Sequence, residues 1–200
     1  MNKDALLKSI AETGYNVGFG AKKHFATYDI VEKVPGWIGF VSMAFGIYAL
    51  VFEVLNEKWL AATLIIFGIA GLYIYFYDTE KMKYEDAGRK LTQLFNKLRD
   101  LYRSVETAND QELPALLKKL SDIESEYYGI GISKQILFSG WYAHFKFFWE
   151  HQIDWIDEQK NFRFWRDKIP LSAILVLVTI VFGLLGLAAN MIIPCFVSTT

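Results

Sequence analysis

Three long runs of apolar residues, none containing a charge, limit what this chain can fold into. They cover residues 35–52, 59–77 and 169–193. At a helical rise of about 1.5 Å per residue, even the shortest run is about 27 Å long, enough to cross the hydrocarbon core of a bilayer. Buried helices of a soluble protein are the alternative, but the absence of charge from all three windows argues against it. We therefore predict an integral membrane protein with three transmembrane helices.

Charge is concentrated outside these runs, and its overall balance is almost neutral. The chain is 53% hydrophobic and 22% charged, with a formal net charge of −1. This balance gives no electrostatic basis for binding nucleic acid, so we expect no nucleic-acid partner. The one cysteine, Cys195, excludes an internal disulfide and a cysteine-based zinc site. We expect no metal and no cofactor.

The apolar runs divide the chain into five segments, and the predicted fold class is all-α. A loop of only six residues joins the first two runs, which must therefore form an antiparallel hairpin. Pro35 is expected in the first turn of the first span, where its missing N–H costs nothing. The segments are a cytosolic amphipathic lead-in helix at 1–34, a transmembrane hairpin at 35–77, a cytosolic helical domain at 78–168, a third transmembrane helix at 169–193 and an extracytoplasmic tail at 194–200.

The distribution of Lys and Arg predicts the orientation in the membrane. Five lysines precede the first span, one lies in the hairpin loop, fifteen basic residues lie in the 78–168 segment, and none follows the third span. Cytoplasmic segments carry the excess of positive residues. The N-terminus and the helical domain are therefore predicted to be cytoplasmic, and the C-terminus extracytoplasmic.

Two amphipathic helices are predicted in the middle segment. Apolar residues recur at three- and four-residue steps through 80–106 and again through 113–127, which gives each helix one apolar stripe. Asn109 or Asp110 is expected to cap the second helix, with Pro114 in its first turn. Neither helix can bury its stripe alone, so they pack together or against another subunit. The pair is either a sensor stalk or oligomerisation module, or a simple spacer.

Residues 133–168 are unusually aromatic. Such rings either form the core of the cytosolic domain or lie at the membrane interface at headgroup level. We assign the earlier part of the segment to the core and its end to the interface, where basic side chains can meet anionic headgroups. The predicted interface residues are Phe162, Arg163, Trp165, Arg166 and Lys168, together with Trp37 and Trp59 near the ends of the hairpin helices.

The same aromatic segment contains an E-H-x-x-D motif on a predicted helix, formed by Glu150, His151 and Asp154, with His144 about two turns before it. Asp154 shares a helix face with His151, where its carboxylate can hold the imidazole in one tautomer. A metal site or acid–base catalysis would use these side chains, but too few ligands are assured for a metal. We interpret the four residues as a polar cluster with a structural or sensing role, and expect no enzyme activity.

Gly14, Gly18 and Gly20 superficially resemble a phosphate-binding loop. The stretch lacks the lysine–serine ending of such a loop, and no predicted strand precedes it. We predict instead an amphipathic helix at 21–32 that leads into the first span.

Three parts of the chain together resemble a known family. They are the lead-in GYNVGFGAKKHFATYDIVEK, the hairpin at 35–77, and WEHQIDWIDEQ at 149–159. Their order is similar to that in the SLATT superfamily, the two-transmembrane effectors associated with nucleotide-sensing bacterial conflict systems. The likeness covers roughly residues 16–159. The third span is an addition to the basic two-span plan, and the lead-in lacks the arginine-rich character of many members.

The resemblance implies a membrane effector of an anti-phage or conflict system in the bacterial inner membrane. Its partners would be the lipid bilayer, further copies of itself, and a cyclic nucleotide or a cytosolic nucleotide-processing enzyme that triggers permeabilisation. The alternative is a non-enzymatic membrane anchor or scaffold that recruits a cytosolic partner through its helical hairpin. The spans favour anchoring over conduction, because few polar side chains are available to line a pore: Ser42, Thr63, Ser172, Thr179 and Asn190.

Overall fold

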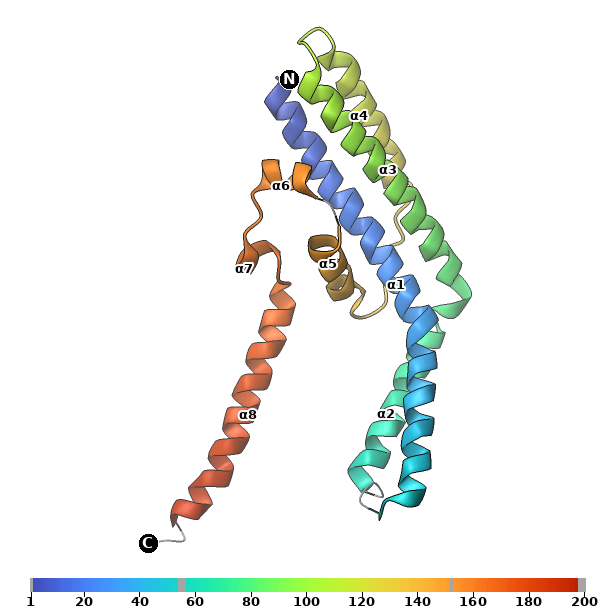
Figure 1. Cartoon of the computed structure of the whole chain (residues 1–200), viewed down its shortest axis with the longest axis vertical. Coiled ribbons are helices and arrows are strands. Elements are labelled where there is room, and N and C mark those ends of the chain that lie inside the picture. The colour runs from blue at the N-terminus through green and yellow to red at the C-terminus, as the bar shows by residue number, and fades with distance from the viewer. Residues whose placement is uncertain (1, 54–56, 152, 198–200) are drawn as a thin grey trace. The chain divides into compact units, whose positions relative to one another are not determined.

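The computed structural model (Figure 1) describes residues 2–53, 57–151 and 153–197, with side chains in the last helix described as far as Gly186. Within these ranges the chain forms helices and no β-strand, which confirms the all-α class. The elements are α1 (Lys3–Val51), α2 (Lys58–Tyr75), the short 3-10 helix η2 (Asp78–Glu80), α3 (Lys81–Thr107), α4 (Leu113–Tyr128), α5 (Ser139–Trp149), α6 (Asp154–Lys160), α7 (Phe164–Asp167) and α8 (Leu171–Val197). Contacts divide the chain into two units, 1–161 and 162–200.

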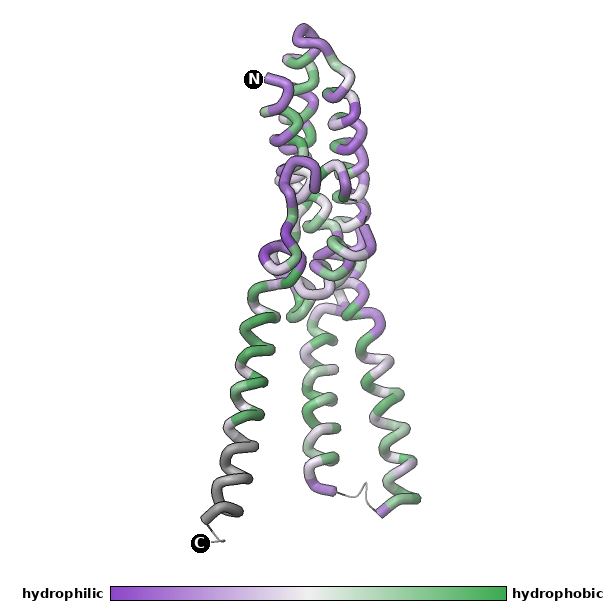
Figure 2. Tube along the Cα trace, turned by 60° about the vertical axis from the view of Figure 1, so that its left-hand side comes forward, coloured by the Kyte–Doolittle hydropathy of each residue, from purple (hydrophilic) through white to green (hydrophobic). Residues whose placement is uncertain are grey.

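α1 is one continuous helix that begins among charged residues and ends in an apolar hairpin with α2 (Figure 2). Asn2 caps its start, where the side-chain oxygen accepts a hydrogen bond from the backbone N–H of Ala5 at 2.9 Å. Pro35 lies inside the helix, so the prediction that it begins the helix of the first span is wrong. A proline in a helix removes one backbone hydrogen bond, but membrane-spanning helices tolerate it because neighbouring groups satisfy the freed carbonyl.

Residues 3–34 of α1 form, with α3, α4, α5 and α6, a unit that we call the helical bundle. α3 runs along α1 in the opposite direction, α4 lies against α3, and α5 and α6 lie against α1 (Figure 1). The predicted stripe of α3 is buried throughout: Ala87, Leu91, Leu94, Phe95, Leu98, Leu101, Tyr102 and Val105. The main partner of this stripe is α1 and not α4, because α1 contributes its own buried face: Leu6, Leu7, Ile10, Ala11, Val17 and Ala21.

Two glycines of α1 allow aromatic rings to touch its backbone. A Cβ atom at Gly18 would lie 2.7 Å from ring carbons of Phe95 and 2.9 Å from a ring carbon of Phe147. One at Gly14 would overlap the ring of Trp155. Ordinary carbon–carbon contact is about 3.5–4.0 Å, so only glycine permits this packing. The stretch around Gly14 and Gly18 is therefore part of a helix, as predicted, and packs against other helices. It is not a phosphate-binding loop.

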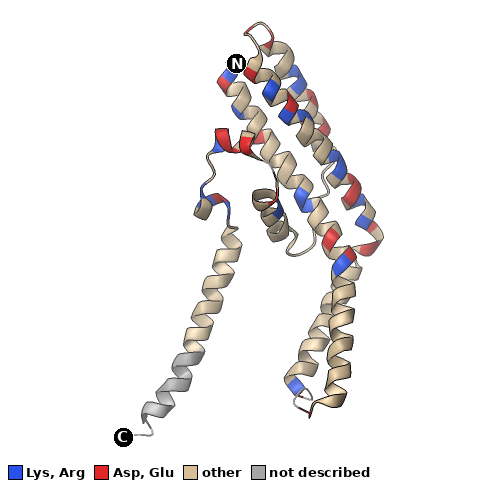
Figure 3. Cartoon of the chain, in the orientation of Figure 1, with Lys and Arg blue, Asp and Glu red and all other residues tan. Residues whose placement is uncertain are grey.

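Residues 35–51 of α1 and the whole of α2 form the membrane hairpin. Both helices carry a segment long and apolar enough to cross a membrane, and the charged residues of the first unit are concentrated in the helical bundle (Figure 3). Most hairpin side chains are exposed, among them Phe40, Ile47 and Ile66. Exposed apolar side chains on this scale are expected of a surface that contacts lipid.

The second unit contains α7 and α8. α8 follows Pro170 and corresponds to the third apolar run, and its apolar stretch with described side chains is Leu171–Gly186. The third membrane crossing therefore stays a prediction. The side chains of Asn190 and Cys195, and the end of the predicted extracytoplasmic tail, lie outside the described residues.

Candidate functional site

The prediction that the E-H-x-x-D motif lies on one helix is wrong. α5 ends at Trp149 and α6 begins at Asp154, so His151 lies in the connection between them. The chain turns here because Phe147 and Trp155, on either side of the motif, both pack against α1 at its two glycines. The ring of His151 lies on the ring of Phe95, with centroids 4.7 Å apart.

The electrostatics of His151 differ from those of a paired catalytic histidine. Burial, and after it the positive charges of Lys22 and Arg99, lower the pKa of His151 to about 4, so the imidazole is neutral at physiological pH. Glu150 and Asp154 are exposed. His144 is partly buried beside the rings of Phe19 and Phe148, at centroid distances of 6.0 and 4.7 Å.

Among the residues that the structure describes, no three His, Cys, Asp or Glu side chains lie close enough together to hold a metal ion. The structural or sensing role of His144, Glu150, His151 and Asp154 stays a prediction.

The predicted interface residues occupy exposed or half-buried positions. Trp37, Trp59 and Trp165 are 65%, 65% and 76% exposed. Arg163 and Arg166 are exposed as well, while Phe162 and Lys168 are half-buried. Arg166 pairs with its neighbour Asp167 at 2.9 Å. Contact of these residues with lipid stays a prediction.

A polar network that was not predicted lies where the helical bundle meets the membrane hairpin. It surrounds residues 130–138, which join α4 to α5 and which we call the junction loop. The Nδ1 atom of His24 lies 2.7 Å from the carbonyl oxygen of Gly20, which places the proton on Nδ1. The Nε2 atom is then an acceptor, and the backbone N–H of Ile132 donates to it at 3.0 Å. Burial lowers the pKa of His24, so the ring stays neutral in this arrangement.

Side chains from α1 and α3 hold the rest of the junction loop. The hydroxyl of Thr27 donates to the side-chain oxygen of Gln135, whose amide nitrogen in turn donates to the carbonyl of Ile132 at 2.7 Å. The hydroxyl of Tyr84 on α3 donates to the carbonyl of Lys134 at 2.7 Å. Thr27 and Tyr84 are almost completely buried, so the bonds that their hydroxyls donate are partly shielded from water.

The end of α2 also contacts the junction loop. The backbone N–H of Leu137 donates to the hydroxyl of Tyr73 at 3.3 Å, and Tyr77 donates to the carbonyl of Gln135 at 3.5 Å. Beneath these bonds lies an apolar cluster to which α1, α2, α3 and the loop all contribute: Val31, Ile74, Tyr77, Tyr84 and Ile136. The junction loop therefore binds both helices of the membrane hairpin and α3 at one point.

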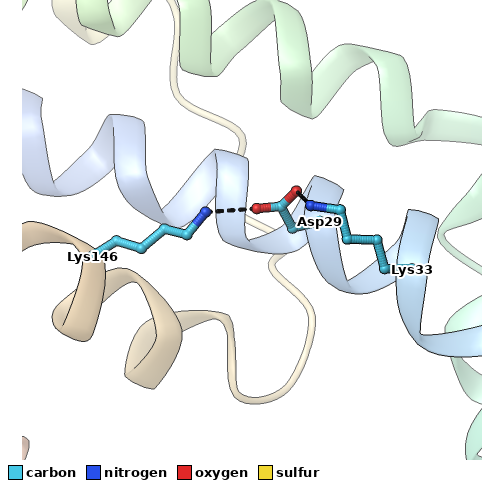
Figure 4. A network of polar contacts seen from close by, with 3 residues as sticks. All are labelled: Asp29, Lys33 and Lys146. Atoms are coloured by element: carbon cyan, nitrogen blue, oxygen red, sulfur yellow. Dashed lines mark hydrogen bonds and ion pairs between the residues drawn. The ribbon is translucent and has the colours of Figure 1, made fainter. Parts of the chain in front are cut away.

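Ion pairs at the same level connect α1 to its neighbours. Asp29 accepts from Lys33 at 2.6 Å and from Lys146 of α5 at 2.8 Å (Figure 4). Burial alone would raise the pKa of Asp29, but the hydrogen bonds from the two lysines outweigh it and hold the pKa below its usual value. Lys81 pairs with Glu32 of α1 at 2.8 Å and with Asp78 at 3.0 Å.

The sequence contained only weak signs of this junction. His24 and Thr27 lie three residues apart in a stretch interpreted as a lead-in helix, and a lone histidine or threonine in such a helix indicates no particular partner. Gln135 is more than a hundred residues away. The tyrosines at 73, 77 and 84 follow helical spacing, but the sequence does not show that their hydroxyls converge on one loop.

Comparison with known proteins supplies the family. A family model described as "SMODS and SLOG-associating 2TM effector domain 6" matches residues 1–177. The match includes the helical bundle, the membrane hairpin, the junction loop and the first part of α8. No curated protein and no solved structure matches the chain.

Proposed function

The chain belongs to the SMODS and SLOG-associating two-transmembrane effector family, and from this membership we propose that it disrupts the bacterial inner membrane when its helical bundle is triggered. The family membership and the two candidate spans make it a membrane effector protein. In the proposed topology the N-terminus and the bundle are cytoplasmic and the C-terminus is extracytoplasmic, as the lysine and arginine distribution predicts.

One observation carries this proposal: α1 belongs to both halves of the first unit. Its residues 3–34 are the centre of the helical bundle, and its residues 35–51 are half of the membrane hairpin. A ligand or partner that moves the bundle relative to the junction loop therefore acts on the membrane segment through a continuous helix. We take the trigger to be a cyclic nucleotide or a cytosolic nucleotide-processing enzyme, and the protein to have no enzyme activity of its own.

In this mechanism the junction loop restrains the resting state. It holds α1, α2 and α3 together through bonds to His24, Tyr73 and Tyr84. Triggering would break these bonds, free the two helices of the hairpin to change their contacts, and allow hairpins of several copies to associate in the membrane. The restrained and the released arrangement of the hairpin would then be two states, and a trigger that binds the bundle can shift the equilibrium between them.

A second candidate function, a non-enzymatic anchor or scaffold, is favoured by the polar groups of the spans. The hydroxyl of Thr63 donates to the carbonyl of Trp59 at 2.8 Å, and that of Thr179 donates to Leu175 at 2.9 Å. Both hydroxyls are thus satisfied within their own helices and need no water-filled pore. An anchor would recruit its partner through the helical bundle and would leave the membrane intact.

Leakage of a dye from liposomes distinguishes the two functions without knowledge of the trigger. Tyr84→Phe removes the hydrogen bond to Lys134, and loss of one such bond costs about 1 kcal/mol, or about a fivefold shift toward the released state. The matched control is Tyr128→Phe, because Tyr128 is 80% exposed. We expect about fivefold faster leakage for Tyr84→Phe than for the wild type or the control.

The double variant Tyr84→Phe/Gln135→Ala should leak faster still, because it also removes the bond from Thr27. Reconstituted protein that stays folded by circular dichroism and never leaks, even as the double variant, would favour the scaffold.

A further inference from the structure

A hollow on one face of α1 lies where the charged part of the helix ends and its apolar part begins. Lys33, Gly36, Trp37 and Phe40 line it, and its volume is about 390 Å³. Gly36 leaves the floor open, since a Cβ atom there would have no neighbour within 4 Å. Trp37 and Phe40 form an edge-to-face pair with ring centroids 6.2 Å apart, and both are about two-thirds exposed. The hollow is therefore apolar on three of its sides and basic on the fourth.

The basic end of this hollow carries an excess positive charge. Asp29 is shared by Lys33 and Lys146 (Figure 4), so one negative charge faces two positive ones. Each ammonium group has three N–H donors. Lys33 uses one of them on Asp29, whereas Lys146 uses one on Asp29 and another on Tyr142, over whose ring it also lies at 4.6 Å from the centroid. The Lys33 side chain is 61% exposed and the Lys146 side chain is 21% exposed, so an anion can reach the donors that are left, those of Lys33 most readily.

We propose that the hollow and the Asp29–Lys33–Lys146 network together bind one phospholipid with an anionic headgroup. The headgroup phosphate accepts hydrogen bonds from Lys33 and from Lys146, and an acyl chain lies over Gly36 against Phe40. Basic pockets beside membrane helices bind anionic headgroups in this way.

A lipid fits better than a soluble anion, for two reasons. The apolar residues of the hollow follow Lys33 directly along α1, and the uncharged run that can cross a membrane begins here, at Pro35. A bound lipid would also connect α1 to α5, because Lys146 belongs to α5.

Native mass spectrometry of the full chain in detergent tests this proposal, with phosphatidylglycerol and phosphatidylcholine as the two probes. A basic residue near the membrane surface contributes about a fivefold factor to the binding of an anionic lipid. The wild type should therefore retain phosphatidylglycerol in preference to phosphatidylcholine. Lys33→Gln should lower retention of phosphatidylglycerol about fivefold and leave that of phosphatidylcholine unchanged.

The matched control is Lys83→Gln. Lys83 is 67% exposed, lies close to the membrane hairpin in the chain, and pairs with a carboxylate of its own helix turn, Glu80, at 2.8 Å. It resembles Lys33 in charge, exposure and pairing, but it does not line the hollow. Its loss should leave retention of phosphatidylglycerol unchanged. An equal loss in Lys33→Gln and Lys83→Gln would show diffuse attraction and overturn the site.

Two further measurements sharpen the assignment. Asp29→Asn removes the negative charge that competes for both lysines, so it should raise retention of phosphatidylglycerol about fivefold. Excess inorganic phosphate should not displace the lipid, because it cannot occupy the apolar part of the hollow. Displacement by phosphate, or equal retention of the two lipids by the wild type, would overturn the proposal. None of these outcomes depends on whether the protein permeabilises membranes.

Discussion

The close packing at Gly18 leads to a quantitative prediction about stability. In Gly18→Ala, the new methyl carbon would lie 2.7 Å from Phe95 and 2.9 Å from Phe147, so these rings must move by about 0.8 Å to restore ordinary contact. Both rings are fully buried and have little room to move. Overpacking costs about 1–3 kcal/mol, and a clash with two buried rings falls in the upper half of that range, about 2–3 kcal/mol. Replacing glycine by alanine in a helix recovers about 1 kcal/mol. We expect a net loss of about 1–2 kcal/mol.

Gly20→Ala is the matched control, on the same helix and only two residues away. A Cβ atom at Gly20 would lie 3.6 Å from a methyl carbon of Leu91, which is ordinary contact. Only the gain in helix propensity is left, so this variant should be more stable than the wild type by about 0.5–1 kcal/mol. The two alanine variants therefore shift stability in opposite directions, although their sequence change is identical.

Thermal unfolding in detergent, followed by far-ultraviolet circular dichroism, measures both shifts. For a chain of this size, 1 kcal/mol corresponds to about 2–4 °C. The midpoint should fall by about 2–8 °C in Gly18→Ala and rise by about 1–4 °C in Gly20→Ala. Adding Phe95→Leu to Gly18→Ala should restore part of the loss, since a smaller side chain relieves the overlap. Shifts of the same sign and size in the two variants would refute the packing of α3 and α5 on this face of α1.

Two further predictions concern protonation and topology. The pKa of His151 is about 4 in the folded protein and 6.5 in an exposed chain, so the unfolded state binds more protons between these values and stability falls as the pH falls from about 6.5 towards 4. The midpoint of thermal unfolding should fall over that window in the wild type and less in His151→Gln, and equal slopes would contradict the burial of the ring. The predicted topology makes Cys195 extracytoplasmic, so a membrane-impermeant maleimide should label it in intact cells, and labelling only after lysis would reverse that orientation.

The helices α3 and α4 could be predicted from the sequence, because each follows from a local pattern. The stripe of α3, from Ala87 to Val105, repeats at helical spacing and is buried throughout. Pro114 lies at the start of α4, as expected. The cap of α4 differs in detail: Glu112, and not Asn109 or Asp110, is the N-cap residue. Asn109 instead accepts from the N–H of Gln111 at 3.0 Å, and its own N–H donates to Glu112 at 2.9 Å.

The partners of the helices could not be predicted in the same way. The apolar stripe of α3 could pack against α4 or against α1, and the sequence pattern does not distinguish the two. The close approach of aromatic rings to Gly14 and Gly18 places α1 at the centre of the bundle. The sequence shows these glycines, but a glycine in a helix indicates only that some close contact is possible, and not which element makes it. The junction depends on pairs such as Thr27 and Gln135, which are 108 residues apart, and periodicity carries no information at that range.

In the proposed mechanism, the number of hydrogen bonds on the junction loop determines the fraction of chains that is released without a trigger. Of the five described above, the four of 3.3 Å or shorter, to His24, Thr27, Tyr73 and Tyr84, join the loop to the three helices around it. At about 1 kcal/mol each, they favour the restrained state by about 4 kcal/mol, which leaves about one chain in a thousand released. A trigger must then bind the released state about a thousand times more tightly than the restrained state to release half of the chains. A trigger with equal affinity for both states would release none, so in the proposed mechanism its binding site must include groups that the junction loop moves.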